Sequence, residues 1–144
     1  MSRQSRLVAG ILLLVLPTVV FGGVRILGLL LGEPGYAENE LRRELWRAGH
    51  AHAGVLLVLS LVTLRYVDEA ALSPGLRRVA RHSVPAAAIL VPAAFFLSVL
   101  SPDATEPNAL IYLAYAGAAS LTAGLLVLGV GLVRRPPRTE EDGM

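Results

Sequence analysis

The chain has 144 residues, of which 54% are hydrophobic and 17% charged, and its formal net charge is +2. Charge is confined to short islands between long apolar runs, which excludes an ordinary water-soluble domain and indicates an integral membrane protein. The absence of cysteine excludes disulfides, thiolate metal sites and cysteine nucleophiles. The basic residues form no continuous face, so no nucleic-acid partner is expected.

The first apolar segment, residues 7–31, is predicted to form one long, tilted membrane span. A bilayer core of about 30 Å needs about 20 helical residues, and this run contains a single charge, Arg25. A cleavable signal peptide is the alternative, because the chain starts with Arg3 and Arg6. A span is preferred, since the run exceeds the core of about 7–15 residues in such peptides and no A-x-A cleavage site follows it.

Three more spans are predicted, at residues 48–64, 84–100 and 109–133. A charged, helix-prone segment at residues 38–47 is expected to lie on the membrane surface before the second span, with Trp46 as its interfacial anchor. Pro92 should kink the third span and free a backbone carbonyl. The charged residues 134–144 are expected to form a disordered tail.

The distribution of arginine predicts how the chain crosses the membrane. All 13 basic residues are arginine, which together with abundant Ala, Gly and Pro is typical of GC-rich bacterial genomes. Nine of them fall at the two chain ends and in the loop between the second and third spans, so both termini are predicted to be cytoplasmic. We therefore expect an all-α, multi-pass protein of the cell membrane, a four-helix bundle that forms one domain over residues 1–144.

Small residues at four-residue spacing predict where helices pack closely. Gly28 and Gly32 form such a stripe in the first span, and Ala116, Ser120 and Gly124 form one in the fourth. A bundle of this size has little interior. The expected partners are therefore the lipid bilayer and either a second copy of the chain or a larger membrane complex.

The candidate functional segment is the start of the second span, which carries two histidines. An ionisable group in or near a membrane span costs free energy unless it is paired or wetted, so His50 and His52 are candidates for a working site. They lie about 200° apart around a helix, so only one can face the interior. We expect His50 to face inward, with Gly54 leaving space beside it, and His52 to face lipid or a neighbouring chain. Packing or interface roles are the alternative for both.

Other polar groups are expected at a similar depth. Arg25 shares a helical face with glycines, so we expect a buried, paired arginine, and snorkelling to the outer interface is the alternative. Tyr112 and Tyr115 share one face of the fourth span. Arginine and tyrosine can hydrogen-bond haem propionates or quinone oxygens, and imidazole can ligate haem iron or another metal. The predicted cofactor site comprises His50, His52, Arg25, Tyr112 and Tyr115, with either histidine as the metal ligand.

The sequence from Arg47 to His52, R-A-G-H-A-H, resembles a segment of the haem-copper oxidase and nitric oxide reductase catalytic subunits. In that family an R-x-x-H pattern opens the second transmembrane helix, and its histidine is an axial haem ligand. The resemblance implies a haem cofactor with His50 as the ligand.

Three functions fit these patterns. The preferred one is an accessory or structural membrane subunit, in which small stripes dock a partner. The second is an outer-leaflet protein that binds haem, a metal or a quinone. The third is a small transporter with Pro92 as a hinge. An enzyme is less expected, because no nucleophile and base pairing, phosphate loop or multi-carboxylate metal site is recognisable.

Overall fold

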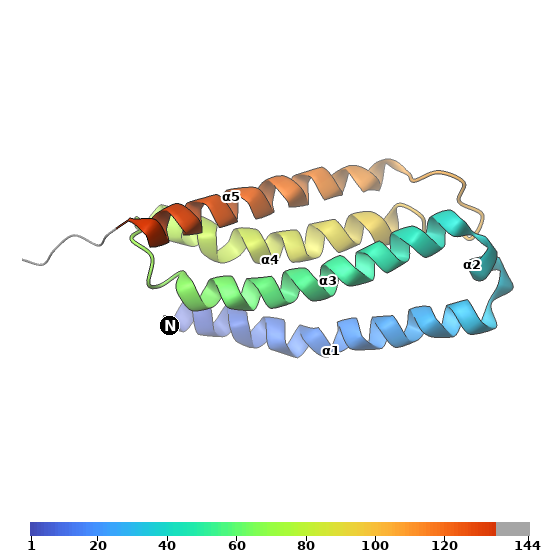
Figure 1. Cartoon of the computed structure of the whole chain (residues 1–144), viewed down its shortest axis with the longest axis horizontal. Helices are drawn as coiled ribbons and strands as arrows, with labels where there is room; N and C mark the ends of the chain where they lie inside the picture. Colours follow the sequence, from blue (N-terminus) through green and yellow to red (C-terminus); the bar gives the residue numbers. More distant parts are fainter. Residues whose placement is uncertain (135–144) are drawn as a thin grey trace, which may run out of the picture.

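The computed structural model describes residues 1–134, which form helices and connecting loops with no β-strand among them (Figure 1). The four long helices are α1 (Arg3–Gly32), α3 (Glu40–Tyr66), α4 (Pro74–Leu97) and α5 (Leu113–Val133). Two short elements, α2 (Pro34–Glu38) and the 3-10 helix η1 (Ala109–Tyr112), join them. Each long helix, with η1 counted as the start of α5, is long and apolar enough to cross a membrane. The prediction of an all-helical chain with four candidate spans is confirmed.

The long helices alternate in direction and pack in the order α1, α3, α4, α5 (Figure 1). The central pair is α3 and α4, with α1 against α3 and α5 against α4. Across residues 1–134, α1 and α5 have at most isolated contacts with each other. The largest buried apolar cluster joins Leu12 of α1, Leu56 and Leu57 of α3, and Val91 of α4. This arrangement is compatible with a four-helix bundle, although α1 is packed along one side only.

Capping residues place two helix starts earlier than hydropathy predicts. The Asn39 side chain accepts a hydrogen bond from the backbone N–H of Arg42, so α3 begins at Glu40 and includes most of the charged segment that was expected as a separate surface helix. Ser73 caps α4 in the same way and Pro74 occupies its first turn, so the following arginines are helical. A side-chain cap satisfies the free N–H groups of a first turn whatever the hydropathy beyond it. The α4 helix continues through Pro92 and ends at Leu97.

The Asn39 side chain has a second role, because its amide also holds the loop that follows α4. Its Nδ2 donates to the carbonyl oxygens of Pro102 and Ala104, at 3.0 and 3.1 Å. The backbone N–H of Asn108 donates to the Ser98 carbonyl at 2.9 Å and closes the same loop. The start of α3 and the α4–η1 connection are therefore joined.

Glycines seven residues apart bring α5 close to α4. A Cβ atom added to Gly117 would lie 2.5 Å from Val91 Cγ2, and one on Gly124 would lie 2.8 Å from Ser83 Cβ. Gly131, seven residues further, faces the loop before α4 in the same way. The Ser120 hydroxyl donates to the Ser83 carbonyl at 2.9 Å. Small residues at this spacing allow the two backbones to approach.

The predicted small-residue stripes are correct only in part. Ser120 and Gly124 do face α4, whereas Ala116 is exposed. The prediction that Gly28 and Gly32 of α1 pack against another helix is wrong within residues 1–134. Cβ atoms added to these glycines would meet no neighbouring atom within 4 Å. Alanine and glycine are so frequent here that spacing alone does not identify the contact face.

A buried ion pair ties together the helix ends near the N-terminus. Arg81 of α4 is 6% exposed, and its Nη2 donates to Asp68 Oδ1 at 3.0 Å. The same guanidinium donates to the Ser5 hydroxyl at 3.1 Å and to the Gln4 side-chain oxygen at 2.8 Å. The backbone N–H of Ser2 donates to Asp68 Oδ2 at 2.6 Å. This Arg81–Asp68 cluster links the start of α1, the end of α3 and the start of α4.

The cluster makes stability depend on pH. Burial raises the pKa of the Asp68 carboxyl, but hydrogen bonds from Ser2, Ser5 and Arg81 outweigh burial and hold the pKa at about 2. The unfolded value is about 3.9, so the stabilisation is complete above about pH 4 and is lost as pH falls toward 2. We expect Asp68→Asn to lower the free energy of unfolding in detergent by about 2 kcal/mol at pH 7 and by much less at pH 2.

A matched control is Glu69→Gln, because the neighbouring Glu69 carboxylate is exposed and pairs with the exposed Arg65. Such surface pairs contribute little to stability, so this variant should be close to wild type at both pH values. An equal loss of stability in Asp68→Asn at pH 7 and pH 2 would contradict the assignment.

Candidate functional site

His50 points at α1 and is half-buried. Its ring lies against Gly22 and Gly23, so that a Cβ atom added to Gly23 would be 2.9 Å from both Cε1 and Nε2 of the imidazole. Gly54, about one turn further along α3, faces the same helix, and a Cβ atom there would lie 3.8 Å from Val19 Cγ1. The inward direction expected for His50 is present. The space expected beside it is taken up by α1, with Gly22 and Gly23 against the ring and the Val19 side chain opposite Gly54.

His52 differs from His50 in both exposure and hydrogen bonding. The side chain is exposed, and its Nδ1 lies 2.7 Å from the carbonyl oxygen of Ala48. A carbonyl can only accept a hydrogen bond, so Nδ1 carries a proton, and in the neutral ring the lone pair is then on Nε2. The ring also lies 5.2 Å from that of Phe95 in α4, measured between centroids. Of the two histidines, His52 is therefore the one with an accessible ligating nitrogen.

The other predicted site residues lie on separate surfaces. Arg25 is exposed and has no ion pair or hydrogen bond from its side chain within residues 1–134. Tyr112 and Tyr115 are 67% and 73% exposed and stack on each other, with ring centroids 6.2 Å apart. They belong to η1 and α5, on the opposite side of the molecule from α1 (Figure 1). One copy of the chain does not bring the five predicted residues together.

Within residues 1–134 Arg25 is neither buried nor paired, which corrects the expectation that it faces the bundle. The glycine pair that faces α3 is Gly22 and Gly23, and Arg25 lies two residues beyond Gly23, about 200° around the helix. Its own face carries Gly28 and Gly32, which point away from the other helices.

Sequence reasoning missed a cluster of arginine and aromatic side chains at the start of α3. Arg42 is 9% exposed, and its guanidinium carbon lies 4.8 Å from the ring centroid of Trp46 and 5.9 Å from that of Tyr36. Its Nε donates to the Val99 carbonyl at 3.1 Å. Two aromatic faces and a carbonyl oxygen, rather than a carboxylate, stabilise this buried charge. The signal in the sequence was the four-residue spacing of Arg42 and Trp46 on one helical face.

The same cluster contains two buried donors without a partner in the described part of the chain, the Tyr36 hydroxyl and the Trp46 indole N–H. Burial raises the pKa of Tyr36, and the positive charge of Arg42 opposes this shift. Trp46 also packs edge-on against Phe96 of α4, with centroids 6.0 Å apart. The residue predicted as an interfacial anchor therefore also joins α2, α3 and α4.

Residues 1–134 hold no group of three or more His, Cys, Asp or Glu side chains that could bind a metal ion. A metal ligated by His52 would need ligands from outside this set. Comparisons with protein-family models, curated proteins and solved structures found no match to this chain. A function for this chain must therefore be inferred from its own sequence and structure.

The contact between His50 and α1 predicts a specific energetic coupling. Gly23→Val should destabilise the protein by about 1–3 kcal/mol, because the new side chain overlaps the imidazole. In a His50→Ala background the same substitution should cost less, with a coupling energy of about 0.5–3 kcal/mol. Chemical unfolding of the four proteins in detergent measures this coupling.

Gly28→Val is the matched control, because it makes the same replacement on the open face of α1. It should have a small effect that is the same in both backgrounds. Additive effects of Gly23→Val and His50→Ala would mean that the ring does not occupy this position.

Proposed function

We propose that the chain is a multi-pass protein of the cell membrane with both termini in the cytoplasm. The exposed surfaces of the helices support insertion, since large apolar side chains such as Leu14 and Ile89 are 81% and 70% exposed. Apolar surface of this extent is unfavourable in water. The start of α1 and the end of α5 lie at the same end of the molecule (Figure 1), and nine of the 13 arginines fall at that end of the predicted topology. The positive-inside rule places that end in the cytoplasm.

Its role in this proposal is that of an accessory or structural subunit of a membrane complex. The outward face of α1, formed by Phe21, Arg25, Gly28 and Gly32, is the docking face. Arg25 is the main support for this role. It is a cation about 10 Å inside the end of an apolar helix. Its side chain is exposed and has no ion pair within residues 1–134. Such a charge is costly unless it is paired or reaches the interface. Gly28 and Gly32 leave room beside it for a second helix.

The partner that fits this face is a transmembrane helix of a different protein that carries Asp or Glu. Two copies of the chain facing each other would bring two Arg25 side chains together, and like charges repel strongly in a low dielectric. The four predicted spans of this chain contain no Asp or Glu. A carboxylate at the depth of Arg25 must therefore come from another polypeptide.

Photo-cross-linking in native membranes tests this docking face. A cross-linking residue at position 28 should give one discrete adduct, with the linked peptide in an apolar helix that contains Asp or Glu. Arg25→Glu should abolish the adduct, and replacing that acidic residue by arginine should restore it. Position 10, where a Cβ atom also meets nothing within 4 Å, is the control and should give no protein adduct.

Three outcomes would contradict the docking role. They are adducts with lipid alone, adducts with a second copy of the chain, and an adduct that Arg25→Leu leaves unchanged. The last of these would mean that Arg25 snorkels to the interface.

A second candidate function is haem binding through His52. The Ala48 carbonyl fixes Nδ1 and leaves Nε2 free, which is the arrangement that metal-ligating imidazoles adopt. Phe95 beside the ring offers an apolar surface for a flat cofactor. This candidate keeps the haem implied by the R-x-x-H resemblance but assigns the ligand role to His52 instead of His50. The distant Arg25, Tyr112 and Tyr115 have no role in it.

Haem binding is tested by optical spectra of the detergent-purified protein, as isolated and after titration with haemin. Wild type and His50→Ala should show the shifted absorption of ligated haem, and His52→Ala should not. His82→Ala is the control for loss of a histidine elsewhere in the chain. Loss of binding in His50→Ala alone would return the ligand role to His50.

A further inference from the structure

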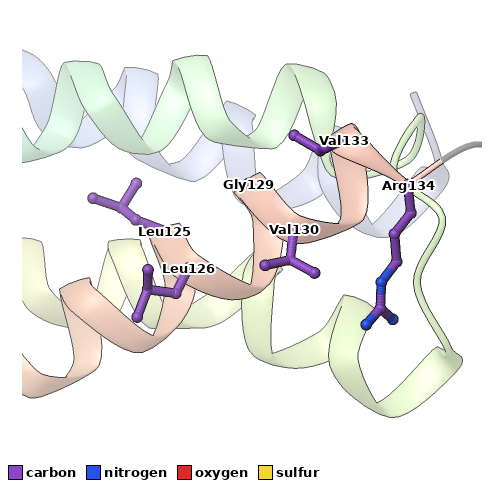
Figure 2. A pocket seen from close by; sticks show the side chains of 6 residues that line it. All are labelled: Leu125, Leu126, Gly129, Val130, Val133 and Arg134. Carbon is purple, nitrogen blue, oxygen red and sulfur yellow. The ribbon is translucent and has the colours of Figure 1, made fainter.

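Two shallow apolar grooves lie along the end of α5. The first, with a volume of about 360 Å³, is lined by Leu125, Leu126, Gly129, Val130, Val133 and Arg134 (Figure 2). The second, of about 230 Å³, is lined by Leu72, Leu76, Leu126, Val127, Val130 and Arg134. Leu126, Val130 and Arg134 belong to both. The grooves therefore flank a common ridge of two apolar side chains, and both end at one cation.

The floor of the first groove is open because of a glycine. A Cβ atom added to Gly129 would meet no neighbouring atom within 4 Å, in contrast to Gly124 and Gly131, which face neighbouring segments. The helix therefore presents a strip without side chains beside the ridge. Figure 2 shows Arg134 beyond the apolar side chains, at the end of the helix.

Arg134 determines which ligand charge the two grooves favour. Its side chain is exposed and has no ion pair among residues 1–134. The C-terminal end of a helix carries partial negative charge and repels anions, so attraction of an anion here depends on the arginine. Arg77 holds the loop that carries Leu72, since its Nη2 donates to the Leu72 carbonyl at 3.2 Å.

We propose that the two grooves bind a diacyl phospholipid with an anionic headgroup. One acyl chain lies on each side of the Leu126 and Val130 ridge, and the phosphate pairs with Arg134. The proposal rests on membrane insertion but not on the docking face of α1, which is on the opposite side of the molecule (Figure 1).

Native mass spectrometry of the protein in mild detergent tests it, with phosphatidylglycerol and phosphatidylcholine of the same acyl chains as probes. Wild type should retain phosphatidylglycerol preferentially, and Arg134→Gln should reduce that preference about tenfold, the effect of one charged hydrogen bond. Gly129→Leu should fill the first groove and reduce retention of both lipids.

Two matched controls use positions on α1 outside the docking face. Gly10→Leu makes the same change as Gly129→Leu where an added Cβ atom also meets nothing within 4 Å, and Arg6→Gln removes an exposed arginine at the same end of the molecule. Both should retain lipid as wild type does. Because all four substitutions are at exposed sites or in open space, each variant should keep the wild-type melting temperature in lipid-free detergent.

The possible failures are distinguishable. Equal retention of the two lipids by wild type, or a preference that persists in Arg134→Gln, would overturn the headgroup assignment. Dissociation of a dimer by Gly129→Leu would assign the groove to a second copy of the chain instead. A chain that stays soluble without detergent and retains neither lipid would overturn membrane insertion itself.

Discussion

The packing of this protein depends on glycine at the points where its long helices come closest. In α4 and α5, Gly117 and Gly124 let the backbones approach, and in α3 and α4, Gly49 lies under Phe96, whose Cε2 would be 3.0 Å from an added Cβ atom. Between α1 and α3, Gly23 makes room for His50. Lipid chains are as apolar as leucine, so burial from water contributes little to helix association in a membrane, and close contact must replace it. Each of the three interfaces meets that requirement with a small residue opposite a larger one.

The polar residues reinforce the ends of the helices and leave α1 with the most free surface. The Arg81–Asp68 cluster links the start of α1 to α4 and to the turn after α3. At the other end of the molecule, Arg42 of α3 contacts the Trp46 ring and donates a hydrogen bond to the Val99 carbonyl that follows α4. Between these ends, and among residues 1–134, α1 packs mainly against α3, and 6% of its most apolar window is buried, compared with 44% for α4. The helix that carries Arg25, which has no ion pair within residues 1–134, is thus also the helix with the least packing.

Long apolar runs were sufficient to predict the number and type of the main elements, because a run of that length has few other structures available in lipid. They were insufficient for the helix starts, which Asn39 and Ser73 determine by side-chain capping. The direction of Arg25 depends on which pair of glycines faces the next helix, and spacing does not reveal this. Helical geometry predicted that His50 and His52 point in different directions, and the R-x-x-H resemblance with Gly54 favoured His50 as the inward one. The contacts of Arg42 could not be predicted in this way, because its hydrogen-bond acceptor, the Val99 carbonyl, belongs to a segment distant in sequence.

Asn39 limits the substitutions that the molecule tolerates at the corner where α2, α3 and the loop after α4 meet. One atom of the amide starts α3, and the other holds the loop after α4. Aspartate has a similar shape but only acceptor atoms, and serine is too short to reach both groups. Asn39 therefore couples the start of α3 to the loop after α4 at the same corner where Arg42 donates to the Val99 carbonyl. A displacement of the turn between α1 and α3 is therefore expected to move the loop between α4 and η1 with it.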